Sequence, residues 1–120
     1  MNRVYYLSTC DTCRRLMKEW DLPASFERID LKTNPIAAEE LEQLRSLTDS
    51  YESLFNKRSR QLREKGLKAK DLVEKDFKDL ILEHYSFLAR PVVVSGESIF
   101  IGNSNANSEK LQEFLKGFNS

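Results

Sequence analysis

Two cysteines, Cys10 and Cys13, are separated by two residues and follow a short apolar run near the N-terminus. A thiol becomes a nucleophile when it ionises, and the N–H groups and dipole at the start of a helix stabilise a thiolate. Cys10 is therefore expected to attack, and Cys13, one turn further along, to resolve a mixed disulfide formed at Cys10. The pair indicates thiol–disulfide chemistry.

Two other roles are possible for a pair of cysteines: packing in the core and binding a metal. Buried free cysteines often pack as small hydrophobic side chains. A zinc site needs four ligands, and the single histidine of the chain, His84, is the only other soft candidate. His84 stands in an apolar helical stripe and is expected to pack in the core. The sequence thus indicates no metal and no bound cofactor.

Asp11 and Thr12 lie between the two cysteines, and Thr12 is assigned a structural role at the site. Asp11 either caps the helix or opposes ionisation of Cys10 by its negative charge, and the sequence leaves both alternatives open.

Arg90 and Pro91 form a second candidate site at the entrance to a strand. Proline suits the first residue of a strand because it has no N–H for the ladder, and its position is compatible with a cis peptide bond. Arg90 would bring a permanent positive charge near Cys10, lowering its pKa or binding an oxyanion. The alternative is an ordinary surface arginine.

The elements that must position these residues follow from hydrophobic periodicity. Residues 4–7 are apolar and aromatic, which predicts a buried strand. A helix is predicted from Asp11 to shortly before Pro23, because apolar residues recur at helical spacing. Residues 25–29 alternate polar and apolar side chains, as a half-buried strand does. The helical stripe consists of Cys13, Leu16, Met17 and Trp20.

Residues 36–88 show helical stripes and no convincing strand. Residues 56–70 are rich in Lys and Arg around Gly66, which predicts a turn between short helices with a solvated basic face. The two stripes are Leu41, Leu44 and Leu47, and Val73, Phe77, Leu80, Ile81 and His84.

The C-terminal part predicts a β-hairpin of residues 91–94 and 98–101, ended by Gly102, and then a closing helix capped by Asn107 or Ser108. Leu111, Phe114, Leu115 and Phe118 form the apolar face of this helix. The order β-α-β, helical insert, β-β-α predicts an α/β fold of thioredoxin-like (glutaredoxin-type) architecture with an inserted α-helical subdomain. Residues 1–120 form one domain, with a core of about 1–35 and 88–120 and an insertion of about 36–87.

Composition limits the partners. Nineteen basic and nineteen acidic residues leave no net charge to attract nucleic acid directly. The N-terminal residues lack the pattern of a signal peptide, and no run approaches the roughly 18 apolar residues of a membrane span. The expected location is the cytoplasm, with no membrane partner.

Four segments together resemble the arsenate reductase (ArsC)/Spx family over nearly the whole chain. They are residues 8–15 (STCDTCRR), 54–58 (LFNKR), 88–94 (LARPVVV) and 100–103 (FIGN). The resemblance implies a thioredoxin-like fold with a helical subdomain, Cys10 as the nucleophile, and Arg90 facing it before a cis Pro91.

The branches of this family differ in function. Arsenate-reducing members generally carry one catalytic cysteine and further arginines around the oxyanion, and use glutathione and glutaredoxin. This chain adds Cys13 and has Gly102-Asn103 where one of those arginines lies, so Arg58 and Arg60 are candidate contacts for an oxyanion or a partner. Members of the Spx branch carry a Cys-x-x-Cys switch and bind the RNA polymerase α subunit.

The resemblance and the cysteine pair together predict a thiol–disulfide oxidoreductase of the ArsC family, with arsenate reduction as one form. Its substrate would be a small oxyanion or a disulfide, and a redox partner protein or thiol reductant (glutathione/glutaredoxin or thioredoxin) would reset it. The alternatives are an Spx-like redox-sensing transcriptional regulator that binds the RNA polymerase α subunit, and a scaffold with inert cysteines.

Overall fold

The computed structural model describes residues 2–118, and the side chain of Phe118, predicted for the closing helix, lies outside the described part. The chain divides into two compact units, each described here by itself. One unit combines the residues up to Thr33 with those from Arg90 onward, and the other is Asn34–Ala89. No helix within residues 2–118 is long and apolar enough to cross a membrane.

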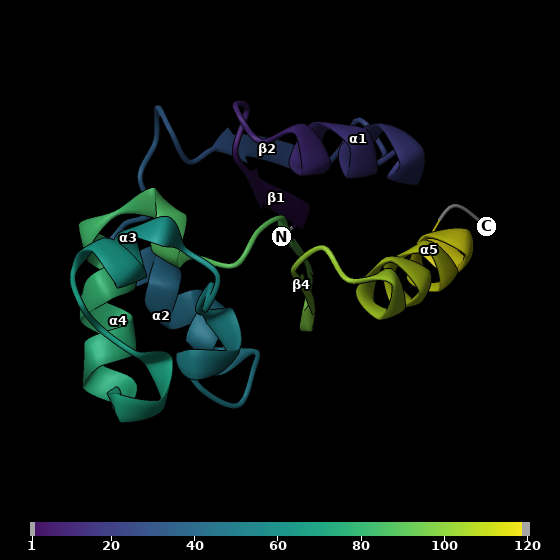
Figure 1. Ribbon diagram of the computed structural model, residues 1–120. Coiled ribbons are helices and arrows are strands. Elements are labelled where there is room, and N and C mark those ends of the chain that lie inside the picture. The colour runs from purple at the N-terminus through teal and green to yellow at the C-terminus, as the bar shows by residue number, and fades with distance from the viewer. Residues whose placement is uncertain (1, 119–120) are drawn as a thin grey trace. The chain divides into compact units, whose positions relative to one another are not determined.

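Over residues 2–33 and 90–118 the first unit contains a mixed sheet and two helices (Figure 1). Its elements are β1 (Asn2–Tyr6), α1 (Asp11–Trp20), β2 (Glu27–Asp30), β3 (Val92–Ser95), β4 (Ser98–Ile101) and α5 (Asn105–Phe118). Within the described residues the sheet has four strands in the order β2-β1-β3-β4. β1 and β2 are parallel, whereas the β1–β3 and β3–β4 pairs are antiparallel. This topology confirms the predicted α/β fold class.

The ends of the first two strands differ slightly from the prediction because turns take up the flanking residues. Leu7 lies beyond β1, and its carbonyl accepts a hydrogen bond from the Cys10 N–H at 3.0 Å. Phe26 precedes β2, and its N–H donates to the Pro23 carbonyl at 3.0 Å. Backbone groups engaged in turns are not available to the sheet ladder.

The predicted hairpin between β3 and β4 forms, but its first strand is Val92–Ser95 and not residues 91–94. Ser95 pairs with Ser98, so the turn consists of Gly96 and Glu97. Gly96 has a φ of 59°, in the left-handed region that two-residue hairpins require and that glycine adopts most easily. The hairpin keeps β3 in register beside β1.

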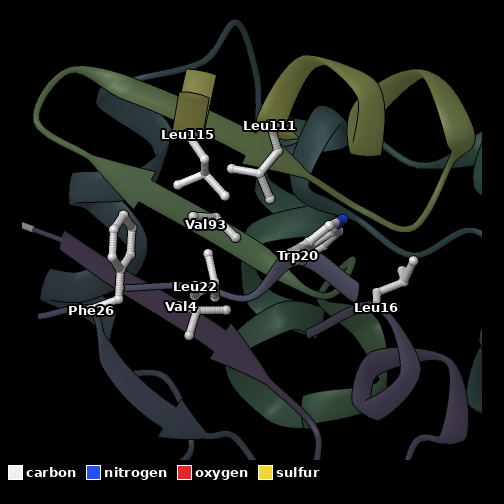
Figure 2. Close-up of a cluster of buried hydrophobic side chains, with 8 residues drawn as sticks. All are labelled: Val4, Leu16, Trp20, Leu22, Phe26, Val93, Leu111 and Leu115. Carbon is white, nitrogen blue, oxygen red and sulfur yellow. The ribbon is translucent and has the colours of Figure 1, made fainter. Parts of the chain in front are cut away.

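One face of the sheet is buried against α1 and α5 (Figure 2). Val4 and Val93 are register partners on β1 and β3 and meet side chains from both helices. The cluster consists of Val4, Leu16, Trp20, Leu22, Phe26, Val93, Leu111 and Leu115. The Trp20 indole N–H also donates to the Ser108 hydroxyl at 3.2 Å. This burial fixes α1, and with it the cysteine pair, on the sheet.

The start of α5 corrects the predicted cap. Neither Asn107 nor Ser108 caps this helix, because it begins earlier, at Asn105. The Ser104 hydroxyl accepts from the Asn107 N–H at 3.1 Å, which is the capping contact. The Asn107 side chain instead donates to the Gly102 carbonyl at 2.9 Å.

The second unit is helical, as predicted. Its elements are α2 (Ala38–Ser46), η1 (Glu52–Leu54), α3 (Arg60–Glu64), η2 (Ala69–Asp71), α4 (Glu74–Glu83) and η3 (Tyr85–Phe87), where η denotes a 3-10 helix. An isolated β-bridge joins Phe55 and Leu88. The centroid of the Phe55 ring lies 4.8 Å from that of the Phe77 ring and 5.7 Å from that of the Phe87 ring. These aromatic contacts form the centre of the unit.

Two members of the predicted second stripe, Val73 and His84, lie outside α4. Val73 is 64% exposed because it lies before the first turn of α4, where its N–H donates to the Asp76 carboxylate at 3.0 Å. His84 follows the end of α4 and has an extended backbone. The periodic pattern therefore extended one residue too far at each end of this helix.

Candidate redox site

Cys10 and Cys13 are free thiols in the first turn of α1. Cys10 is the N-cap residue and is half-buried, and its carbonyl accepts the first helical hydrogen bond, from the Arg14 N–H at 3.1 Å. Cys13 is fully buried, on the same face as Leu16 and Trp20. The two thiols therefore lie close together with different exposure, which suits an attacking and a resolving role.

The pKa of Cys10 lies below its ordinary value. Partial burial is the largest single influence and raises the pKa, but several other groups together outweigh it. They are the backbone N–H and the thiol of Cys13, the positive charge of Arg90 and the backbone N–H of Thr12. Each of these groups stabilises the thiolate more than the thiol.

The pKa of Cys13 moves in the opposite direction, to about 11. Burial is the main cause, and the nearby Cys10 sulfur also raises the pKa. A backbone hydrogen bond from Leu7 and the charge of Arg90 lower it, without offsetting burial. Cys13 therefore stays protonated at neutral pH, while Cys10 ionises more readily.

Arg90 is half-buried and acts on both sulfurs through its charge. The peptide bond between Arg90 and Pro91 is cis. The Pro91 carbonyl accepts from the Gly102 N–H at 2.9 Å, which ties the entrance of β3 to the end of β4. We call Cys10, Cys13, Thr12 and Arg90 the cysteine cluster.

Asp11 is the first residue of α1 rather than its cap, since Cys10 occupies the N-cap position. Its exposed carboxylate pairs with Arg14 one turn later. An acidic residue in the first turn also interacts favourably with the helix dipole. The capping alternative for Asp11 is therefore wrong.

Arg58 and Arg60 both lie in the second unit and are exposed. Arg60 is the first residue of α3. Arg58 lines an open hollow of about 340 Å³ with Lys57, Ser59 and Arg63. Their contribution to the cysteine cluster stays a prediction.

His84 belongs to a hydrogen-bonded group in the second unit, which we call the His84 cluster: His84, Ser86, Ser59 and Asn56. The His84 Nδ1 atom accepts from the Ser86 N–H at 3.0 Å and lies 2.8 Å from the Ser86 hydroxyl. The Ser59 hydroxyl donates to that hydroxyl at 3.0 Å, and the Asn56 amide donates to the Ser86 carbonyl at 3.0 Å. No group of three or more potential metal ligands gathers anywhere in residues 2–118.

Asp30, at the end of β2, is a residue near the cysteines that the sequence did not single out. Its carboxylate accepts from the Ser8 N–H at 3.2 Å, in the loop that leads to Cys10. The signal was available, because parallel neighbouring strands bring their carboxyl ends to the same edge of a sheet. A polar residue ending β2 is thus expected beside the loop that follows β1.

Comparison with known proteins shows which family the chain resembles. A model of the ArsC family matches residues 5–111. The chain belongs to the ArsC family. Two of the four segments that carry the resemblance, residues 8–15 and 88–94, contain the members of the cysteine cluster.

The similar proteins are named either as transcriptional regulators or as arsenate reductases. The "Global transcriptional regulator Spx" of Lactiplantibacillus plantarum is 26% identical over 115 residues, which cover 93% of this chain and 84% of that protein. A possible arsenate reductase from Streptococcus mutans UA159 is 25% identical, with a TM-score of 0.69 and coverage of 92% of this chain and 97% of the other. An arsenate reductase from Vibrio cholerae, 16% identical, shares the fold with a TM-score of 0.71, covering 93% and 95% of the two chains.

Proposed function

We propose that this ArsC-family protein is a thiol–disulfide oxidoreductase in which Cys10 is the nucleophile and Cys13 the resolving thiol. The observation that carries the proposal is the placement of two thiols within one helical turn, with Cys10 half-buried at the N-cap and Cys13 fully buried. The opposite directions of their pKa shifts agree with this placement. A thiol that ionises readily attacks, and a neighbouring thiol that stays protonated waits until a mixed disulfide has formed.

The reaction with a disulfide substrate has two steps. The Cys10 thiolate attacks one substrate sulfur, the substrate S–S bond breaks, and the other sulfur leaves as a thiolate and takes up a proton. Cys13 then loses its proton and attacks the Cys10 sulfur, releasing the second substrate thiol. Two electrons have passed to the substrate, and Cys10 and Cys13 are joined by a disulfide.

The high pKa of Cys13 is compatible with the second step. The Cys10 sulfur is one of the causes that raise it. Once Cys10 is part of a mixed disulfide it carries no negative charge, so Cys13 ionises more easily than in the reduced protein. An external thiol reductant, glutathione with glutaredoxin or thioredoxin, must reduce the disulfide afterwards, which fits a cytoplasmic protein.

A small oxyanion is the other substrate class. Cys10 would displace one oxygen of arsenate, which leaves as water after protonation, and form a thio-arsenate adduct. The Arg90 guanidinium supports this step because it matches the geometry and charge of an oxyanion. Arg58 and Arg60 are further candidates for that contact.

A redox-sensing transcriptional regulator is the second candidate function, and the names of the curated relatives favour it. In that case the disulfide would alter the first turn of α1 and change how the protein binds a partner, which the family resemblance suggests is the RNA polymerase α subunit. The chemistry at the cysteine cluster is the same in both cases, and what differs is its consequence.

To test the proposal, the reduced protein is treated with bis(2-hydroxyethyl) disulfide, and the products are identified by mass spectrometry. The proposal expects an internal Cys10–Cys13 disulfide in the wild type and a stable mixed disulfide on Cys10 in Cys13→Ser. Absence of both products would exclude thiol–disulfide exchange. Binding of purified RNA polymerase α subunit only to one redox form, without steady turnover of the disulfide, would favour the regulator.

A further inference from the structure

The carboxylate of Asp30 binds the loop that leads to Cys10. Its Oδ1 atom accepts from the backbone N–H of Ser8 at 3.2 Å and from that of Lys32 at 3.1 Å. A hydrogen bond from the Ser8 side chain is the main cause that lowers the pKa of Asp30, so the carboxylate is the form that fits here. Three donors thus converge on one side chain.

The loop segment held by Asp30 contacts both cysteines. The carbonyl of Leu7, the residue before Ser8, accepts from the Cys10 N–H at 3.0 Å. The backbone of Leu7 also hydrogen-bonds with the sulfur of Cys13. A shift of this segment would therefore move Cys10 relative to the N–H groups that stabilise its thiolate.

The sheet explains why Asp30 reaches the loop. Asp30 is the register partner of Tyr6, the last residue of β1, and the Leu31 N–H donates to the Tyr6 carbonyl at 2.8 Å. The two parallel strands therefore end side by side, and the loop after β1 passes the carboxylate that ends β2.

We propose that Asp30 is a positioning residue for Cys10: by holding Ser8 it keeps the Cys10 sulfur at the start of α1. This inference rests on the proposed function only in taking Cys10 as the reactive thiol. An aspartate that only stabilised its own turn would accept a hydrogen bond from the Lys32 N–H, two positions later, and from no distant residue. Asp30 also binds Ser8, 22 positions earlier in the chain, so its role reaches beyond its own turn.

The experiment compares Asp30→Ala with Asp30→Asn. Alanine removes the acceptor, whereas the amide oxygen of asparagine keeps it and removes only the charge. Iodoacetamide alkylation of the reduced full chain, measured against pH and assigned to Cys10 by mass spectrometry, is the readout. Glu27→Gln is the matched control, since it neutralises a carboxylate at the other end of β2, where Glu27 pairs with Arg3.

Asp30→Ala should raise the alkylation midpoint of Cys10 toward the value of about 8.5 for a free cysteine. A rise of 0.5 to 1 unit would slow alkylation by about 3- to 10-fold at pH values below the midpoint, because the thiolate fraction there falls tenfold per unit. Asp30→Asn should stay within about twofold of the wild type, and Glu27→Gln should not change.

A folded Asp30→Ala protein with the wild-type midpoint would overturn the inference. If Asp30→Ala does not fold, Ser8→Ala decides, because it removes only the hydroxyl donor; a smaller rise in the midpoint supports the inference, and no change overturns it. Failure of the proposed function is a separate result: the wild type would form no Cys10–Cys13 disulfide whatever the variants do.

Discussion

In both the cysteine cluster and the His84 cluster, polar groups surround a side chain that could react. In the cysteine cluster these groups change the ionisation of a thiol, whereas in the His84 cluster they hold the backbone. In the cysteine cluster, N–H groups and the Arg90 charge act on the sulfur of Cys10 and favour its ionised form. In the His84 cluster, the imidazole caps a 3-10 helix by accepting from the Ser86 N–H. Two further hydrogen bonds there join Asn56 and Ser59 to Ser86.

This difference separates a reactive site from a structural one. A histidine beside two serine hydroxyls has the composition of a nucleophile and its base. In the His84 cluster, however, the hydroxyls and the imidazole hold two chain segments together. The cysteine cluster instead stabilises the thiolate of Cys10, and this agrees with the proposed role of Cys10 and with a supporting role for the His84 cluster.

Replacing the nucleophile has the largest expected effect. In Cys10→Ser only Cys13 remains, and burial, the largest cause that raises its pKa, is still present, so Cys13 stays mainly protonated at pH 7. Alkylation by iodoacetamide at pH 7 should fall by about 100-fold or more, because the thiolate is the reactive form. Cys13→Ser is the matched control and should keep rapid alkylation at Cys10. Equal rates in the two variants would remove the distinction between the thiols.

Arg90 should have a smaller effect on the same thiol. Arg90→Gln removes a charge that lowers the pKa of Cys10. The alkylation midpoint should rise by about 0.5 to 1 unit, a change of about 3- to 10-fold in rate below the midpoint. Arg90→Lys keeps the charge without the planar guanidinium, so its alkylation midpoint should lie between those of the wild type and Arg90→Gln. The role of Arg90 is refuted if glutamine leaves the pH profile unchanged.

His84 should affect stability rather than reactivity. His84→Ala removes the acceptor for the Ser86 N–H and should lower the free energy of unfolding in urea by about 1–2 kcal/mol. Asparagine accepts similar turn hydrogen bonds, so His84→Asn should lose less. Alkylation of Cys10 should be unchanged in both. A shift of the Cys10 midpoint in His84→Ala would contradict the division between the clusters.

The stability of the reduced protein should depend on pH in two windows. Because folding lowers the pKa of Cys10, the folded state binds fewer protons there, and stability rises with pH up to the unfolded value of about 8.5. Because folding raises the pKa of Cys13 to about 11, the folded state binds more protons above 8.5, and stability falls as pH approaches 11.

Urea unfolding of the wild type and of Cys13→Ser from pH 6 to 11 isolates the second window. The difference between their unfolding free energies should shrink or reverse between pH 8.5 and 11. A difference that stays constant over this range would show that Cys13 does not resist ionisation in the folded state.

The element order and the position of the cysteine pair could be predicted because they depend on local patterns. Helical spacing from Cys13 to Trp20 and a glycine turn at Gly96 are visible within a few residues. The cap of α5 could not be chosen among neighbouring polar residues, because Ser104, Asn107 and Ser108 all have side chains able to cap. The contact of Asp30 with Ser8 depends on strand pairing, which joins residues far apart in sequence.

The central claim is that two thiols three positions apart have opposite surroundings. Iodoacetamide alkylation of the reduced wild type from pH 4 to 12, with mass spectrometric assignment, tests it most directly. We expect a midpoint for Cys10 below the free value of about 8.5 and one for Cys13 near 11. A shared midpoint near 8.5, or a lower midpoint for Cys13 than for Cys10, would contradict it.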